Sequence, residues 1–391
     1  MHAFSFASTP HIYFGAGKRH QLSGLVATFG RRLLLVTGAH SFDRSLHGDA
    51  LLTALQETFE LRRLRVNGEP SPQLVDEAVA IYAPWKPDCV VAIGGGSAID
   101  AGKAIAGLLR TGDSVMAYLE GVGQGKCYGG PSTPFIALPT TAGTGGECSK
   151  NAVLSFIAKE GFKKSFRHEL LVARAIILDP ELCFNTPAHV TAACGMDALT
   201  QLLESYVSTS ANPMTDALAL SGLAYLRDGL ITAVEQGHDL HGRACMLYAA
   251  SISGLTLANA GLGSVHGLAS PLGAFFPIPH GVVCGTLLAS AARQNMKLLA
   301  LQQSDHPVLH KYASVGRLLK NNPTLSDKHA CSALLDLLDE WTVRLKMERL
   351  SVYGIQADDI SNIVAHASGG MKTNPVLLNK AQMEELLLSR L

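Results

Sequence analysis

Four polar residues in an otherwise apolar part of the chain have the types and spacing of a metal site. Asp197 and Gln201 are four residues apart in a helical stretch that starts near Thr186, so they share one helix face. An aspartate on such a face is costly unless it is paired or bound to a metal. His266 and His280 follow among glycines and apolar residues. Imidazoles with a carboxylate suit Fe(II) or Zn(II) with a position open to substrate, although each histidine could instead be a hydrogen-bonded core residue.

A glycine-rich turn earlier in the chain suggests a phosphate cradle. Residues 94–100 read GGGSAID, between an apolar run at 89–93 and a helical pattern at 98–109. Glycines let a backbone approach a pyrophosphate closely, and a helix N-terminus offers free N–H groups. Asp100, with Lys103 on the following turn, sharpens this interpretation over a purely structural turn.

A second turn of the same kind follows the apolar run at 135–138. Residues 139–147 read PTTAGTGGE. Hydroxyls between small residues suit hydrogen bonds to a nicotinamide amide, a ribose or a phosphate. Either turn alone could be ordinary, but two at the ends of two strands together predict a dinucleotide site.

The elements that would position these residues divide the chain into two parts. Short apolar runs at 33–37, 89–93, 135–138 and 175–178 alternate with helical patterns such as 71–82 and 98–109, which is typical of a parallel sheet covered on both faces. From Thr186, an N-cap candidate before Pro187 at the first helical position, the pattern is helical to Leu391. We therefore expect an α/β dinucleotide-binding domain at 1–185 and an all-helical metal and substrate domain at 186–391, with the ligand site between them.

Composition excludes several other classes of protein. The 391 residues include 32 basic and 32 acidic side chains, which argues against a nucleic-acid partner. Eight scattered cysteines without CxxC spacing are expected to be free thiols in a reducing cytoplasm. The N-terminus lacks a signal-peptide pattern, and the apolar stretch at 247–279 is interrupted by glycines, Pro271 and His266, so we expect no membrane span.

These residues together resemble the iron-containing (group III) alcohol dehydrogenases, a superfamily that includes glycerol dehydrogenase and dehydroquinate synthase-like folds. The likeness runs nearly end to end. Its motifs in chain order are IYFGAG at 12–17, GGGSAIDAGK at 94–103, PTTAGTG at 139–145, LDPEL at 178–182, GMDA at 195–198, PLG at 271–273, PHG at 279–281 and NP at 374–375.

The resemblance implies a Rossmann-like domain, a helical domain of the dehydroquinate synthase-like fold, and hydride transfer in the cleft between them. It implies that Gly95, Gly96 and Ser97 hold the pyrophosphate with Asp100 nearby. The remaining implied contacts are Thr140, Thr141 and Thr144 along the adenosine and nicotinamide side, Lys163 at a phosphate or ribose, and Leu182 on the nicotinamide.

The sequence departs from the family pattern at three places. The family's metal site has one aspartate and three histidines, but Gln201 stands where the third histidine is expected, and a carboxamide is a weaker ligand. Ser270 replaces a histidine that serves proton transfer, so we expect protons to leave through a hydroxyl or water. Gly38 replaces an aspartate that favours NAD, with His40, Ser41 and Arg44 close behind, so NADP is allowed.

The expected function is an NAD(P)-dependent alcohol dehydrogenase or aldehyde reductase. A metal held by Asp197, His266 and His280 would act as a Lewis acid on the substrate oxygen while hydride passes to or from the nicotinamide. One alternative is a metal-free reductase of the maleylacetate reductase type, since Gln201 weakens the site. Two others are a dehydroquinate synthase-like lyase, which the apolar stretch from His266 to His280 disfavours, and a non-catalytic nucleotide-binding module.

The residues around the candidate site indicate the class of substrate. Small and apolar residues near the site, with Phe275 and Phe276 as possible borders, indicate a modest alcohol or aldehyde rather than a polyanion. A homodimer is expected as the commonest assembly of soluble enzymes.

Overall fold

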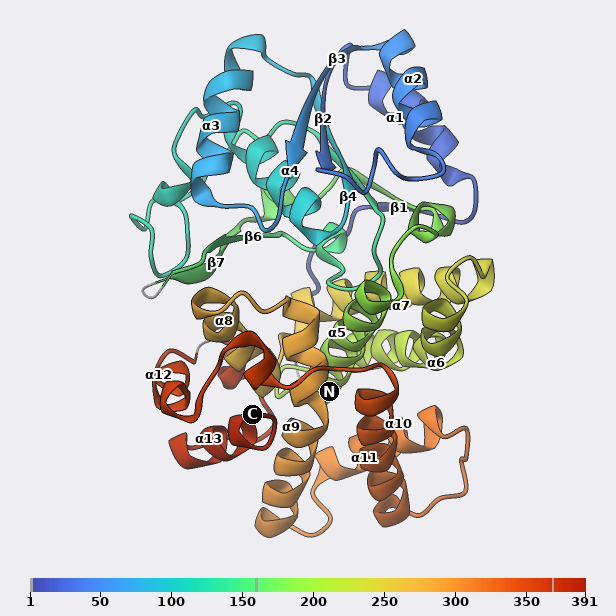
Figure 1. Cartoon of the computed structure of the whole chain (residues 1–391), viewed down its shortest axis with the longest axis vertical. Helices are drawn as coiled ribbons and strands as arrows, with labels where there is room; N and C mark the ends of the chain where they lie inside the picture. Colours follow the sequence, from blue (N-terminus) through green and yellow to red (C-terminus); the bar gives the residue numbers. More distant parts are fainter. Residues whose placement is uncertain (1–2, 159–160, 368) are drawn as a thin grey trace.

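A parallel β-sheet forms the centre of the first half of the molecule (Figure 1). The computed structural model describes residues 3–158, 161–367 and 369–391. The sheet has six strands in the order β1-β8-β5-β4-β2-β3, and every neighbouring pair is parallel. The strands are β1 (His11–Phe14), β2 (Arg32–Gly38), β3 (Glu60–Val66), β4 (Cys89–Gly94), β5 (Phe135–Pro139) and β8 (Ala175–Leu178).

The four predicted apolar strands are confirmed as β2, β4, β5 and β8. Their side chains alternate between two hydrophobic clusters, one on each sheet face. Leu34 and Val90 pack with helices α3 (Pro72–Tyr82) and α4 (Gly96–Leu108), whereas Leu33 and Val91 pack with α1 (Leu22–Ala27) and α2 (Gly48–Thr58). Burial on both faces explains why these strands read as continuous apolar runs.

Three strands carry weaker sequence signals. β3 is an edge strand with the sequence ELRRLRV, in which a glutamate and three arginines are mixed with two leucines and a valine. β6 (Asn151–Phe156) and β7 (Phe162–Arg167) pair antiparallel as a separate two-stranded sheet. None of the three was predicted, because partly exposed strands need no apolar run.

Helices form the second half of the chain, shown below the sheet in Figure 1. No strand follows Leu178 in the part of the chain that the structure describes. The helices are α5 (Ala188–Val207), α6 (Pro213–Glu235), α7 (Leu240–Ala260), α8 (Ser264–Phe275), α9 (His280–Gln302), α10 (Pro307–Leu319), α11 (Asp327–Arg344), α12 (Ile360–Ala365) and α13 (Lys380–Leu388). An α/β half followed by an all-α half is the predicted fold class.

The apolar helices of this half pack on one another. By length and composition α6 could cross a membrane, and α7 with α8 would pass the same test only as a pair bent by 102°. α6 lies against α5 and α7, with Leu223, Leu226 and Leu230 fully buried. The apolar stretch at 247–279 forms the later part of α7, all of α8 and the turns beside them.

The prediction that Thr186 is the N-cap of α5 is wrong. The helix begins at Ala188 with Pro187 at its N-cap, and no side chain caps it. The hydroxyl of Thr186 instead donates to the carbonyl oxygen of Thr140 at 2.8 Å. Thr186 therefore ties the entry of the helical half to the second glycine-rich turn.

The two halves touch through glycines at this turn. A Cβ on Gly145 would lie 2.3 Å from the carbonyl oxygen of Ala250, and a Cβ on Gly254 would lie 2.1 Å from that of Gly145. Such distances leave no room for a side chain on either glycine. The N-terminal segment also reaches the helical half, since the backbone N–H of Ala7 donates to Oδ1 of Asn259 at 2.6 Å.

Lys103 holds the second turn from inside the protein. It lies in α4 with 0% exposure, and its Nζ donates to the carbonyl oxygens of Ser149 at 2.8 Å and Asn151 at 2.7 Å, and to that of Gly146. Burial lowers the pKa of Lys103, while the nearby carboxyl of Asp100 opposes that shift. Lys103 is therefore a support for the turn rather than a group facing a phosphate.

We expect Lys103→Met to destabilise the protein by about 3 kcal/mol. The substitution leaves three carbonyl groups without their hydrogen-bond donor, and it removes the cation beside the carboxyls of Asp100 and Glu147. Dinucleotide affinity should fall with it, because the second turn loses its support. Denaturant unfolding and fluorescence titration with NADH measure the two effects. The exposed Lys320→Met is the control, and equal stability of the two variants would contradict this role.

Candidate active site

One face of α5 supplies three polar side chains to a buried cluster. Asp197 is 1% exposed, Gln201 2% and Glu204 6%. Nε2 of Gln201 donates to Oδ1 of Asp197 at 3.4 Å, and its Oε1 accepts from the hydroxyl of Ser253 on α7 at 2.9 Å. The predicted shared face of Asp197 and Gln201 is therefore present, with the amide nitrogen toward the carboxylate.

The start of α8 is capped by side chains from distant parts of the chain. The N–H of Ser264 donates to Oδ1 of Asn374 at 3.0 Å, and the N–H of Val265 donates to Oε1 of Glu204 at 2.7 Å. A Cβ on Gly263 would lie 2.7 Å from the Asn374 oxygen and 2.8 Å from the Glu204 oxygen. Glycine at 263 thus allows both caps to reach the helix, and the caps fix where His266 lies.

His266 connects Glu204 to Asp197. Its Nδ1 lies 2.7 Å from Oε2 of Glu204, and its Nε2 lies 3.3 Å from Oδ1 of Asp197. A carboxylate at Nδ1 holds a proton there, so in the neutral imidazole the lone pair is on Nε2, which is directed at the cluster. This is the arrangement that orients metal-binding histidines in proteins.

His280 and Cys284 reach the cluster because α9 packs very closely on α5. A Cβ on Gly281 would lie 2.4 Å from the carbonyl oxygen of Ala193, and one on Gly285 would lie 2.8 Å from Cβ of Met196. These two glycines are one helical turn apart, so the helix backbones can touch. His280 is the first residue of α9 and Cys284 is on its next turn.

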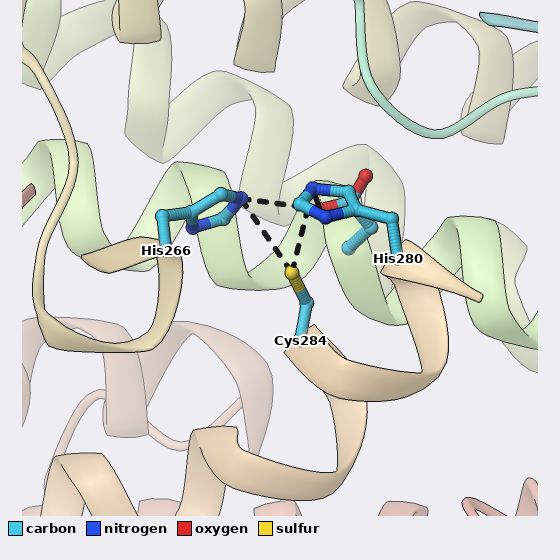
Figure 2. A group of neighbouring side chains, drawn as sticks. His266, His280 and Cys284 are labelled. Carbon is cyan, nitrogen blue, oxygen red and sulfur yellow. Dashed lines mark hydrogen bonds and ion pairs between the residues drawn. The ribbon is translucent and has the colours of Figure 1, made fainter. Parts of the chain in front are cut away.

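Figure 2 shows His266, His280 and Cys284 directed at a common point. Nε2 of His280 lies 3.7 Å from Oδ1 of Asp197. Sγ of Cys284 lies 3.6 Å from Nε2 of His266 and 3.7 Å from Nε2 of His280. The thiol was expected only to be free, and all eight cysteines are free, but its place in this cluster was not foreseen.

The electrostatics of the cluster favour a bound cation. Burial alone would raise the pKa of Asp197, but His280 and His266 hold it below its ordinary value, so the carboxylate is charged. Burial lowers the pKa of His280 to about 4, which keeps its imidazole neutral. Burial would also lower the pKa of His266, yet Cys284 and the two facing carboxylates raise it well above its ordinary value. A positive charge at this point is therefore stabilised, whether a proton or a metal ion carries it.

The donor spacing fits a single metal ion. One ligand atom from each of Asp197, His266, His280 and Cys284 lies within 4.8 Å of the others. Ligands about 2.1 Å from a tetrahedral ion are about 3.4 Å apart. The separations of 3.3–3.7 Å measured from Asp197 Oδ1 to the imidazole nitrogens agree with that geometry.

The two glycine-rich turns lie against each other at the ends of β4 and β5. The N–H of Thr140 donates to the carbonyl oxygen of Gly94 at 2.9 Å. A Cβ on Gly95 would lie 3.2 Å from Oγ1 of Thr141, and one on Gly96 would lie 3.3 Å from Oγ1 of Thr144. The residues expected at the cofactor are thus neighbours, with Ser97 in the first turn of α4.

Burial and the charges of nearby lysines set the pKa of Asp100 in α4. Burial raises its pKa to about 7, and Lys103 partly opposes the rise.

Gly38 ends β2 beside Ser41. A Cβ on Gly38 would lie 2.6 Å from Oγ of Ser41. The Ser41 hydroxyl therefore occupies the space that an aspartate side chain would need.

The other expected contacts are distributed around the site. Nζ of Lys163 on β7 pairs with Glu69 at 2.5 Å and lies near Gly273 of α8. The hydroxyl of Ser270, one turn after His266, donates to the carbonyl oxygen of Lys163 at 3.2 Å. Leu182 is 4% exposed and belongs to the hydrophobic cluster that contains Ile93 and Leu138.

Sequence reasoning missed Glu204 and Cys284. Glu204 lies seven residues after Asp197 and Cys284 lies four after His280. Both spacings place a residue on the same helix face as the ligand candidate, so extending the helix-face argument by one turn would have found both.

We expect Glu204→Gln to weaken binding of a divalent metal by about 10- to 100-fold, because an amide no longer fixes His266 as the carboxylate does. Isothermal titration of metal-stripped protein with Zn²⁺ measures the change. The exposed Glu340→Gln is the control. Unchanged affinity in Glu204→Gln would show that Glu204 only caps α8.

Two matches to known protein families together cover almost the whole chain. Residues 9–180 match the family described as iron-containing alcohol dehydrogenase, and residues 191–391 match the C-terminal part of the Fe-containing alcohol dehydrogenase family. The chain is 31% identical over 394 residues to alcohol dehydrogenase 4 of Saccharomyces cerevisiae, covering 98% of this chain and 97% of the relative. It is 34% identical over 325 residues to 1,3-propanediol dehydrogenase of Klebsiella pneumoniae, covering 81% and 77%.

Solved structures give the same result. A 1,3-propanediol oxidoreductase superposes with a TM-score of 0.90 at 27% identity and covers 100% of both chains. Sulfoacetaldehyde reductase from Bifidobacterium kashiwanohense in complex with NAD⁺ has a TM-score of 0.86 at 27% identity, covering 100% of this chain and 99% of the other. The chain therefore belongs to the iron-containing alcohol dehydrogenase family and is an oxidoreductase that acts on CH–OH groups.

Proposed function

We propose that this enzyme uses a divalent metal, Fe(II) or Zn(II), to interconvert a small alcohol and its aldehyde with NAD(P). The observation that carries the proposal is the cluster of buried Asp197 with the partly buried His266 and His280, whose donor atoms have the spacing of metal ligands. A bound metal would supply Lewis acidity, which stabilises an alkoxide in oxidation or polarises a carbonyl in reduction. Gln201, which the sequence pattern also placed among the ligands, lies at the edge of this cluster with its amide nitrogen toward Asp197.

The cofactor is proposed to lie across the two glycine-rich turns. Gly95, Gly96 and Ser97 would hold the pyrophosphate at the start of α4, where the helix dipole favours negative charge. The other cofactor contacts proposed are Asp100, Thr140, Thr141, Thr144, Lys163 and Leu182. Thr186 ties the second turn to the entry of α5, the helix that carries Asp197. The nicotinamide end of the cofactor would therefore face the side chains around Asp197.

We propose that the site for the cofactor ribose, beside Gly38, accepts the 2′-phosphate of NADP. Gly38 carries no carboxylate to repel a 2′-phosphate, and the Ser41 hydroxyl lies directly over it. Arg44 is exposed in the same loop. A hydroxyl and a guanidinium are suitable partners for a phosphate.

Proton transfer is proposed to use Ser270 or water, since no histidine follows His266 by one turn. The hydroxyl of Ser270 is held by the carbonyl oxygen of Lys163, so it lies at the boundary between the two halves. We propose a cytoplasmic enzyme, which the eight free thiols support, and a homodimer, the commonest assembly of soluble enzymes. The substrate class is a short alcohol or aldehyde, as in the 1,3-propanediol enzymes to which the chain is similar.

We expect Asp197→Ala to lower kcat at least about 100-fold, because about 2.7 kcal/mol of charge stabilisation in the transition state is lost with the metal. Dinucleotide affinity should stay within about threefold, since the glycine-rich turns are untouched. Steady-state reduction of short aldehydes, metal analysis and NADH titration measure the three quantities. The exposed Asp336→Ala is the control. Retained activity in Asp197→Ala would favour a metal-free reductase.

We expect Gly38→Asp to change the preference for the cofactor. The new side chain needs the space of the Ser41 hydroxyl, so the test uses Gly38→Asp with Ser41→Ala, and Ser41→Ala alone as control. The ratio of kcat/KM for NADPH to that for NADH should fall about tenfold relative to the control, which corresponds to about 1.4 kcal/mol of charge repulsion. An unchanged ratio would place the 2′-phosphate elsewhere.

A further inference from the structure

We propose that Cys284 is a metal ligand, in the position left open by the absence of a third histidine, and that Gln201 positions Asp197 instead of binding the ion. The inference rests on the proposed metal-dependent function and specifies its ligand set as Asp197, His266, His280 and Cys284. On binding, the Cys284 thiol releases its proton to solvent and the sulfur forms a bond to the metal.

The position of the sulfur supports this assignment. Sγ of Cys284 is nearly equidistant from the two imidazole nitrogens, at 3.6 Å from His266 and 3.7 Å from His280. Its side chain is buried, and its sulfur lies in the group of donor atoms that includes Asp197. Sulfur on a zinc ion lies about 2.3 Å away, so the observed spacing accommodates one ion among the four donors.

The orientation of Gln201 argues against its amide as the fourth ligand. Its Nε2 faces the Asp197 carboxylate at 3.4 Å, and an amide nitrogen with two hydrogens has no lone pair for a metal. Its Oε1, which could bind, is instead within 2.9 Å of the Ser253 hydroxyl. A donor at one carboxylate oxygen orients Asp197 without using a coordination position.

The spacing alone does not make a cysteine a ligand, and the chain contains a comparison. Cys245 on α7 also follows a histidine by four residues, and its sulfur lies 3.5 Å from Nε2 of His241. At Cys284 the sulfur also meets a second imidazole and a buried carboxylate, and this convergence is not found for Cys245 among the described residues. Cys245 is therefore a matched control for the effect of losing a buried thiol beside an imidazole.

A thiolate changes which ion the site prefers. Soft sulfur ligands suit Zn²⁺, whereas a set of oxygen and nitrogen donors gives no such bias. With four protein ligands the substrate oxygen would enter as a fifth ligand, which zinc accepts in catalytic sites.

X-ray absorption of the Zn²⁺-loaded full-length protein tests the assignment directly. We expect one sulfur scatterer at about 2.3 Å in the wild type, absent in Cys284→Ser and retained in Cys245→Ser. The Co²⁺-loaded wild type should show a thiolate-to-cobalt charge-transfer band in the near ultraviolet, which does not depend on whether a variant folds. Gln201→His in the Cys284→Ser background should restore Zn²⁺ affinity to within about tenfold of the wild type without restoring the sulfur signal.

The outcomes separate this inference from the proposed function. Bound zinc with only nitrogen and oxygen scatterers in the wild type would overturn the role of Cys284 and leave a metal-dependent enzyme. A sulfur signal that persists in Cys284→Ser would also overturn it. Failure of the wild type to bind Zn²⁺ or Co²⁺ at all would overturn both.

Discussion

The buried carboxylate of Asp197 is the constraint on which the arrangement of the helical half depends. A charge that is 1% exposed in the middle of a core helix is tolerable only when positive or hydrogen-donating groups surround it. Three other helices meet this demand: α8 brings His266, α9 brings His280 and Cys284, and α7 brings Ser253, which holds Gln201. The packing of the helical half and the chemistry of its site therefore have the same origin.

Glycine permits the close approaches that this arrangement needs. Gly281 and Gly285 let α9 touch α5, and Gly263 lets the start of α8 receive its two distant caps. At the boundary between the halves, Gly145 and Gly254 lie backbone to backbone, so the second glycine-rich turn is fixed relative to the helices that carry Asp197 and its partners. Hydride transfer needs reacting atoms about 3–3.5 Å apart. These close backbone contacts set the distance between the proposed nicotinamide site and the cluster around Asp197.

The sequence predicted the parts of the structure that have a local signal. The strands β2, β4, β5 and β8 are buried on both faces and read as apolar runs, whereas the polar edge strand β3 and the β6–β7 hairpin had no such run. Asp197, His266 and His280 were predicted as a cluster because their types are unusual in apolar surroundings, and the structure brings them together. Thr186 was misassigned as a cap because its hydroxyl bonds to Thr140, 46 residues earlier. Such long-range partners, like those of Glu204, leave little trace in the local sequence.

The most direct test of the account is metal analysis of the purified enzyme, coupled to NADH and NADPH oxidation with short aldehydes before and after chelation. We expect close to one equivalent of Zn or Fe per chain, loss of turnover on chelation, and recovery when the metal is returned. Protein that contains no metal and reduces aldehydes equally well after chelation would contradict it. The cluster around Asp197 would then stabilise a proton rather than a metal ion.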